Sequence, residues 1–158
     1  MNDIVRLRYL LNCVQKEGNK KYTELLAPLG ITPNQSEVLQ VLEACEPLSL
    51  KELGELLICE QKSPSRLVQR LVNNQLIYKS KDLVDSRRSV LHLTKAGRDL
   101  LPAIKEKEQA FNEHISQTLQ EAIEPAAFNQ ILAKQIAGTA SEKKILQREQ
   151  LAEKSLSN

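Results

Sequence analysis

Aromatic side chains are scarce in this sequence of 158 residues, which has no tryptophan, three tyrosines and two phenylalanines. Leucine, isoleucine and valine must therefore fill the apolar interior, and a core of this kind favours helices with leucine-rich stripes. Hydrophobic residues make up 41% of the chain, which is enough for a well-formed core. The length predicts one compact domain or two tightly fused lobes.

Cysteine and histidine are also rare. The cysteines Cys13, Cys45 and Cys59 are odd in number and form no CxxC pair, and the two histidines, His92 and His114, lie far apart. This usage argues against a disulfide framework and a structural zinc site, so we expect no metal. Nucleophile elbows and phosphate-binding loops are missing too. We therefore expect no catalytic residue, no cofactor and no enzyme.

Long apolar runs are absent as well. No segment reaches the length of a membrane span, and the N-terminus lacks the pattern of a signal peptide. Together with the few cysteines, these absences predict a soluble, cytoplasmic protein in a reducing compartment, without a membrane partner.

Charge is nearly balanced over the whole chain, with a net value of +2, but it is unevenly distributed. Residues 60–100 contain nine basic and four acidic side chains, a local net charge of +5, which leaves −3 for the remainder. A basic lobe on a mildly acidic body is expected where one face meets phosphate groups. On charge alone, a chance cluster on a solvated face explains the pattern equally well.

Two short helices are predicted between residues 49 and 73. The first begins with a capping box, Ser49 and Glu52, and continues through leucines at helical spacing. The second, within SPSRLVQRLV, places apolar residues on one face and polar residues on the others. The apolar set is Leu67, Val68, Leu71 and Val72, and the polar set is Ser65, Arg66, Gln69, Arg70 and Asn73.

The turn between these helices lies near Cys59, whose side chain we expect to point inward and lock the two helices together. Two starts stay open for the second helix. Either Glu60 caps it with Pro64 in the first turn, or Ser63 caps it with Pro64 at the first helical position. Both present backbone N–H groups at a helix N-terminus, which suits a phosphate.

A basic β-hairpin follows. Apolar-rich strands at residues 76–80 and 89–93 flank a charged tip, KDLVDSRR. Within the tip, Asp85 is expected to pair with an arginine and stiffen it for a minor groove, although a solvated loop also explains a DxR pattern. Helix, turn, helix and basic hairpin in this order form a winged helix-turn-helix.

Long helices are predicted on both sides of this unit, and about six helices are expected in all. Residues 4–29 carry one apolar stripe and end at Gly30, and Thr94 caps a second long helix that contains Pro102. A helix from a second subunit is one way to cover the first stripe, and packing within the chain is the other. The last twenty residues form either one more exposed helix or a frayed tail.

This layout resembles the MarR (multiple antibiotic resistance regulator) family of bacterial transcription factors over about residues 5–137. The family's wing pattern runs roughly G-L-V-x-R, D-x-R, L-T and then G after two residues. In the same register this chain has Gln75-Leu76-Ile77-Tyr78-Lys79, Asp85-Ser86-Arg87, Leu93-Thr94 and Gly97. Gln75 replaces the usual glycine, which requires either a left-handed glutamine or a different turn.

The resemblance implies a mainly α fold with a small β-hairpin wing, assembled as an intertwined homodimer. Residues 1–31 and 100–137 would form the helical dimerisation region, 32–99 the winged helix-turn-helix DNA-binding domain, and 138–158 a C-terminal helix or tail. Two recognition helices about one helical turn apart would read a near-palindromic operator in double-stranded DNA.

Eleven residues are assigned to DNA contact as hypotheses. The expected major-groove readers, with arginine for guanine and glutamine for adenine, are Ser65, Arg66, Gln69 and Arg70. The expected phosphate contacts are Ser49, Lys62 and Ser63. In the wing, Arg87 would enter the minor groove or meet the flanking backbone, oriented by Asp85, while Arg88 and Lys79 add positive charge.

The family also implies that a small aromatic effector binds between the dimerisation helices and the DNA-binding lobes and releases the operator from a repressor. Tyr9, Tyr22, Phe111 and His114 are the candidates for such a pocket, and each fits the core or the dimer interface equally well. Two other functions stay open: a protein-interaction adaptor that has lost DNA binding, and a thiol-responsive regulator that uses Cys59.

Overall fold

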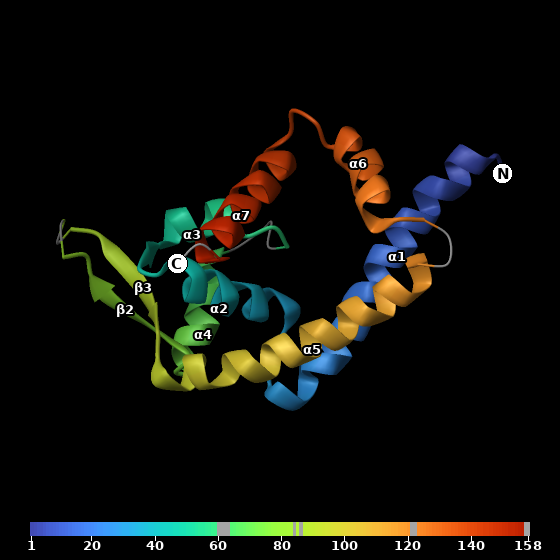
Figure 1. Ribbon diagram of the computed structural model, residues 1–158. Helices are drawn as coiled ribbons and strands as arrows, with labels where there is room; N and C mark the ends of the chain where they lie inside the picture. Colours follow the sequence, from blue (N-terminus) through green and yellow to red (C-terminus); the bar gives the residue numbers. More distant parts are fainter. Residues whose placement is uncertain (60–63, 84, 86, 121–122, 157–158) are drawn as a thin grey trace.

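The computed structural model describes residues 1–59, 64–83, 85, 87–120 and 123–156. These residues form seven α-helices, one short 3-10 helix and three strands (Figure 1). In chain order the elements are α1 (Asp3–Leu26), η1 (Ala27–Leu29), α2 (Pro33–Cys45), β1 (Leu48–Ser49), α3 (Leu50–Leu56), α4 (Pro64–Asn73), β2 (Ile77–Lys81), β3 (Ser89–Leu93), α5 (Lys95–Gln120), α6 (Pro125–Gln135) and α7 (Ala140–Leu156). None of the helices in these ranges has both the length and the apolar character of a membrane span.

The expected hairpin is confirmed, and it belongs to a three-stranded antiparallel sheet in the order β1-β3-β2. Ile77 lies opposite Leu93 and Tyr78 opposite His92, so the two wing strands pair in a continuous register. The third strand, β1, was not predicted. It pairs Leu48 with Leu91 and thereby fixes the start of α3 against the wing.

Helix α2 lies at the centre of the core. It begins with a capping box, in which the Thr32 hydroxyl accepts the Gln35 N–H and the Gln35 side chain accepts the Thr32 N–H. Four leucines of α2, α3 and α4 are fully buried in a core that also contains residues of the sheet and the first part of α5: Leu39, Leu42, Leu53 and Leu71. The winged helix-turn-helix is therefore the best-packed part of the molecule.

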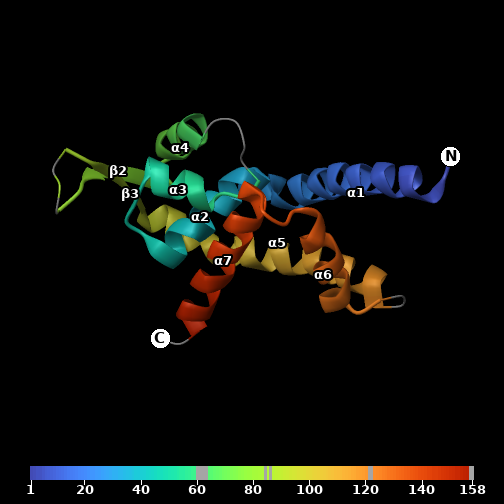
Figure 2. The same ribbon diagram turned by 90° about the horizontal axis from the view of Figure 1, so that it is seen from above.

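Helices α1 and α5 run side by side away from this lobe, and the N-terminus lies at the far end (Figures 1 and 2). Where they meet, the rings of Tyr22 and Phe111 stack with their centroids 5.0 Å apart. Farther out, the predicted stripe of α1 stays uncovered, and Ile4 and Val14 are 74% and 69% exposed.

The C-terminal segment folds into α7, which resolves the choice between a helix and a frayed tail for residues 140–156. This helix does not extend into solvent. It turns back after Gly138, a left-handed residue, and packs against α2 and α3 (Figure 1). The helix-turn-helix thus has α7 on a face that the sequence left unassigned.

Candidate nucleic-acid interface

Helix α4 has the amphipathic arrangement that its sequence predicts. Leu67, Val68 and Leu71 are buried, at 7%, 1% and 0% exposure, and hold the helix on the core. Four polar side chains occupy the opposite, exposed face: Ser65, Arg66, Gln69 and Arg70. This exposed face, with two guanidinium groups and an amide, has the donors and acceptors that read base edges in a major groove.

The amide of Gln69 is held within this face. Its Nε2 donates a hydrogen bond to Oδ1 of Asn73, one turn later, at 2.9 Å. The side-chain carbonyl of Gln69 keeps its acceptor capacity, and one amide hydrogen also remains for a ligand.

The start of α4 is only partly described. Among the described residues, α4 runs from Pro64 to Asn73. Lys62 and Ser63, two candidate phosphate contacts, lie outside the described residues, and so does the choice between Glu60 and Ser63 as the cap.

Ser49 is used as the N-cap of α3. Its hydroxyl accepts the N–H of Glu52 at 3.3 Å, and the Glu52 carboxylate accepts the N–H of Ser49 at 2.8 Å. The predicted capping box is therefore confirmed. The Ser49 hydroxyl also hydrogen-bonds the Glu52 carboxylate, so within the folded lobe this side chain serves the cap of α3.

The wing tip is a tightly hydrogen-bonded turn. The Arg88 N–H donates to the Asp85 carbonyl at 2.9 Å, and the Asp82 N–H donates to the Arg88 carbonyl at 3.0 Å. The Asp85 carboxylate accepts the backbone N–H of Arg87 at 3.0 Å. Asp85 makes no ion pair among the described residues, so it supports the main chain of Arg87 rather than a guanidinium, contrary to the expectation.

Arg87 and Arg88 therefore differ in their surroundings. Arg87 projects from the tip, exposed, and Lys79 is exposed on β2. Arg88 instead pairs with Glu52 on α3, with its Nη2 3.0 Å from a carboxylate oxygen. Hydrogen bonds from Ser49, followed by the Arg88 guanidinium, lower the pKa of Glu52 to about 2. The positive charge of Arg88 is thus paired with a carboxylate of the same lobe.

The Thr94 hydroxyl and a close approach at Gly97 connect α4, the wing and α5. Gln75 has a φ of 57°, so the left-handed glutamine is one of the two expected outcomes. The Thr94 hydroxyl donates to the Gln75 carbonyl at 2.7 Å and accepts the Gly97 N–H at 3.0 Å, which confirms Thr94 as a helix cap. A Cβ on Gly97 would lie 2.1 Å from the Leu76 carbonyl oxygen. The final glycine of the wing pattern is therefore required by a close backbone approach.

Cys59 is an exposed residue, so its side chain is not enclosed between the two helices as expected. At this turn the Cys59 N–H donates to the Glu37 carboxylate at 3.1 Å, and the Cys59 thiol is hydrogen-bonded with the same residue. Partial burial, and then the negative charge of Glu37, raise the pKa of the Cys59 thiol. A raised pKa leaves less thiolate at neutral pH and does not favour a reactive thiol.

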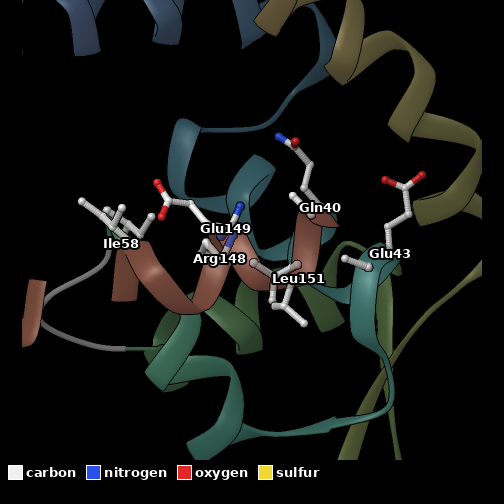
Figure 3. A pocket seen from close by; sticks show the side chains of 10 residues that line it. Gln40, Glu43, Ile58, Arg148, Glu149 and Leu151 are labelled. Carbon is white, nitrogen blue, oxygen red and sulfur yellow. The ribbon is translucent and has the colours of Figure 1, made fainter. Parts of the chain in front are cut away.

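Two of the four effector candidates contact each other. Tyr22 and Phe111 stack on each other, and the Tyr22 hydroxyl lies 3.1 Å from the Ser36 hydroxyl. Tyr9 and His114 are exposed. A cavity of about 370 Å³ lies elsewhere, between α2 and α7, where Gln40, Ile58, Arg148 and Leu151 are among its lining residues (Figure 3).

A comparison with models of protein families identifies the family of this chain. The model described as "Transcriptional regulator SarA/Rot" matches residues 20–104, which is more than half of the chain and spans all of the winged helix-turn-helix. The chain belongs to the SarA/Rot family. It is therefore a transcriptional regulator, in agreement with the expectation that it is not an enzyme.

Individual SarA/Rot relatives agree. The chain is 29% identical to the HTH-type transcriptional regulator SarZ of Staphylococcus epidermidis over 109 residues, which cover 68% of this chain and 74% of that protein. It is 28% identical, over the same coverage, to SarZ of Staphylococcus aureus.

Solved structures confirm the resemblance to the MarR fold. A MarR-like regulator from Bacillus cereus superposes with a TM-score of 0.70 at 18% identity, over 84% of this chain and 94% of the other. The Escherichia coli MarR mutant complexed with operator DNA gives 0.72 at 23% identity, over 86% and 96%. The S. aureus MepR–DNA complex gives 0.69 at 23% identity, over 80% and 91%. The mainly helical winged helix-turn-helix is thus the fold of this SarA/Rot regulator.

Proposed function

We propose that this regulator binds a near-palindromic DNA operator as a homodimer and represses transcription. The exposed polar face of α4 is the observation that carries the proposal, because its arginines and glutamine stand on a helix whose other face is fixed in the core. Several structural neighbours are DNA complexes of MarR-type proteins, and one of them is a transcriptional repressor, CouR, bound to a 23-mer duplex.

In this proposal α4 enters the major groove and the wing reaches the adjacent groove or backbone. Arg66, Arg70 and Gln69 read base edges, with Ser65 at the margin. Arg87 is the principal wing contact, because Arg88 is paired with Glu52. Contacts from Ser49, Lys62, Ser63 and Lys79 to phosphates position the lobe.

The proposed dimer is supported by the uncovered surface of α1. Residues 1–31 and 100–137 are proposed as the dimerisation region, and 32–99 as the DNA-binding domain. The apolar stripe of α1 is too exposed for a monomer, with Leu7 and Leu11 at 50% and 41%. A two-fold partner would cover the stripe and place the two α4 helices in successive major grooves.

Release by a small aromatic effector is proposed on the family resemblance. The Tyr22–Phe111 stack lies between α1 and α5, where the DNA-binding lobe joins the dimerisation helices. A ligand that favours an unsuitable spacing of the two α4 helices would release the operator.

The test is a gel shift with single-site variants. The probe is a duplex enriched from a random-sequence library by the wild-type chain. Arg66→Ala and Arg87→Ala are expected to weaken binding by about 1–3 kcal/mol each, because each removes a base or groove contact. Lys143→Ala, an equal loss of charge on the exposed face of α7, is the control and should leave the affinity unchanged.

Unchanged affinity in both arginine variants would refute the assignment. If the wild-type chain binds no duplex in a salt titration, the fold serves as a protein-interaction adaptor instead.

A further inference from the structure

An acidic side chain of α2 holds the chain where it leaves α3. The carboxylate of Glu37 accepts the N–H of Ile58 at 2.7 Å and the N–H of Cys59 at 3.1 Å. The Glu37 side chain is only 10% exposed. A carboxylate so little exposed requires hydrogen bonds or a counter-charge, and here both are present.

The counter-charge comes from α7. Nη1 of Arg148 lies 3.4 Å from a carboxylate oxygen of Glu37 and 3.5 Å from the Leu56 carbonyl oxygen. Nζ of Lys144, one turn earlier on the same face, donates to the Leu57 carbonyl at 2.6 Å. Leu56 is the last residue of α3 and Leu57 is its C-cap.

These carbonyls belong to the end of a helix, where no intrahelical donor is available and the helix dipole is negative. Two cations from α7 therefore occupy positions that stabilise the C-terminus of α3. The same two cations neutralise the carboxylate that orients the following turn. Helices α2, α3 and α7 are joined at one point by groups that are 87 to 111 residues apart in the sequence.

Helix α3, which carries this junction at its C-terminus, also packs against the start of α4. A Cβ on Gly54 of α3 would lie 3.6 Å from the ring of Pro64, the first residue of α4. Helix α4 thus packs directly on α3, the helix that α7 holds. Tightly packed elements transmit a displacement rather than absorbing it.

We infer that α7 is a positioning element for α4, with Arg148 and Lys144 holding the end of α3 in the orientation that the recognition face requires. The inference rests on the proposed DNA binding through α4. Neither residue touches DNA in this account. Without them, the wing and the exposed face of α4 keep their charge but the angle of α4 is less well defined, so sequence readout is lost while attraction to phosphate is retained.

The test compares two duplexes of equal length, one enriched by the wild-type chain and one of scrambled sequence. Arg148→Ala is expected to weaken binding to the enriched duplex about tenfold, as for other residues coupled through one network, and to leave binding to the scrambled duplex unchanged. Arg148→Lys restores part of the difference, since it keeps the charge. Lys143→Ala, on the same helix but exposed and outside the junction, is the matched control.

Circular dichroism and thermal unfolding check that each variant is folded. Lys144→Met provides a milder second variant, because it removes one hydrogen bond and leaves the Glu37 pair intact. Amide hydrogen exchange at Ile58 and Cys59 gives a local readout, and it should accelerate in Arg148→Ala while the amides of β2 and β3 stay protected.

Equal losses on both duplexes, or no loss in a folded Arg148→Ala, overturn the positioning role. If Arg66→Ala loses sequence specificity but Arg148→Ala and Lys144→Met keep it, the positioning role of α7 is wrong and the proposed DNA binding through α4 still stands. If Arg66→Ala binds like the wild type, or if no duplex is enriched at all, the proposed DNA binding through α4 is refuted, and so is the inference that depends on it.

Discussion

The carboxylate of Glu52 joins β1, α3 and the wing of the DNA-binding lobe. It closes the capping box of α3 by accepting the Ser49 N–H, and it pairs with Arg88 of the wing at 3.0 Å. Since α3 precedes α4 and the wing follows it, this half-exposed pair links the wing to the helix-turn-helix. The wing arginine that remains for DNA is Arg87.

The first prediction concerns the loss of stability at low pH through the Glu52 carboxyl. In the folded chain the pKa of Glu52 is about 2, against an ordinary value of 4.5. As pH falls from 4.5 toward 2, the unfolded chain takes up a proton that the folded chain does not. The stability contributed by Glu52 is therefore complete above pH 4.5 and declines through this window. Because the side chain is exposed, solvent screening keeps the effect small.

A ¹³C titration of the Glu52 carboxyl checks this prediction. Ser49→Ala should raise the midpoint most, because the hydrogen bonds from Ser49 are the main cause of the low pKa, and Arg88→Ala should raise it less. The chain unfolded in urea serves as the reference. A midpoint near 4.5 in the folded wild type would contradict the described network.

Residue-level features were predictable when their partners are near in sequence. Ser49 with Glu52, and Thr32 with Gln35, are three residues apart, so helix geometry alone brings them together. Arg88 reaches Glu52 across 36 residues, and Arg148 reaches Glu37 across 111. Such pairs depend on the packing of whole elements, which the sequence does not reveal.

At the scale of elements, the junction between α4 and β2 shows a compromise. The Leu76 N–H donates to the Leu71 carbonyl at 3.0 Å, and the Gln75 N–H donates to Val72 at 2.9 Å. These two bonds define a Schellman motif, whose left-handed position is usually glycine. Here that position is Gln75, with a φ of 57°.

Gln75→Gly should therefore stabilise the protein. Relief of the left-handed strain exceeds the added entropy of the unfolded chain, so the free energy of unfolding should rise by about 1 kcal/mol. Asn74→Gly is the control, because Asn74 does not have a positive φ and should lose about 0.5–1 kcal/mol. Urea unfolding measures both. A Gln75→Gly variant less stable than the wild type would argue against strain at this residue.

The elements themselves were largely predictable, since helical and strand periodicity and the turn signals are local. Strand β1 was missed because two residues, Leu48 and Ser49, are too few for an alternating pattern. The packing of α7 was missed for another reason. Its sequence is rich in charged residues and reads as exposed, and only the fold shows that Lys144 and Arg148 find partners at the end of α3.

At the scale of the whole molecule, the main feature is the uncovered stripe of α1. Its apolar side chains recur at helical spacing, yet within one chain Ile4, Leu7 and Val14 are half or more exposed. Water-exposed apolar residues in one row indicate a surface that a partner covers. A second copy would cover it with an identical stripe.

Replacing Leu7 and Leu11 together by glutamate should abolish the dimer. Burying two carboxylates in an apolar interface is expected to weaken association by at least about a hundredfold. Asn12→Glu adds charge to α1 away from the stripe and is the control. Sedimentation equilibrium should give twice the chain mass for the wild type and the control, and the single chain mass for the double variant. A wild-type chain that sediments as a monomer would exclude the dimer.

The central claim is that two copies of this chain read DNA through two α4 helices at a fixed spacing. Selection of bound duplexes from a random-sequence library by the wild-type chain, followed by sequencing, tests it most directly. The account predicts a near-palindromic sequence whose half-site centres lie about 10–10.5 base pairs apart, one helical turn. An enriched pool without two-fold symmetry, or no enrichment over the starting library, would contradict it.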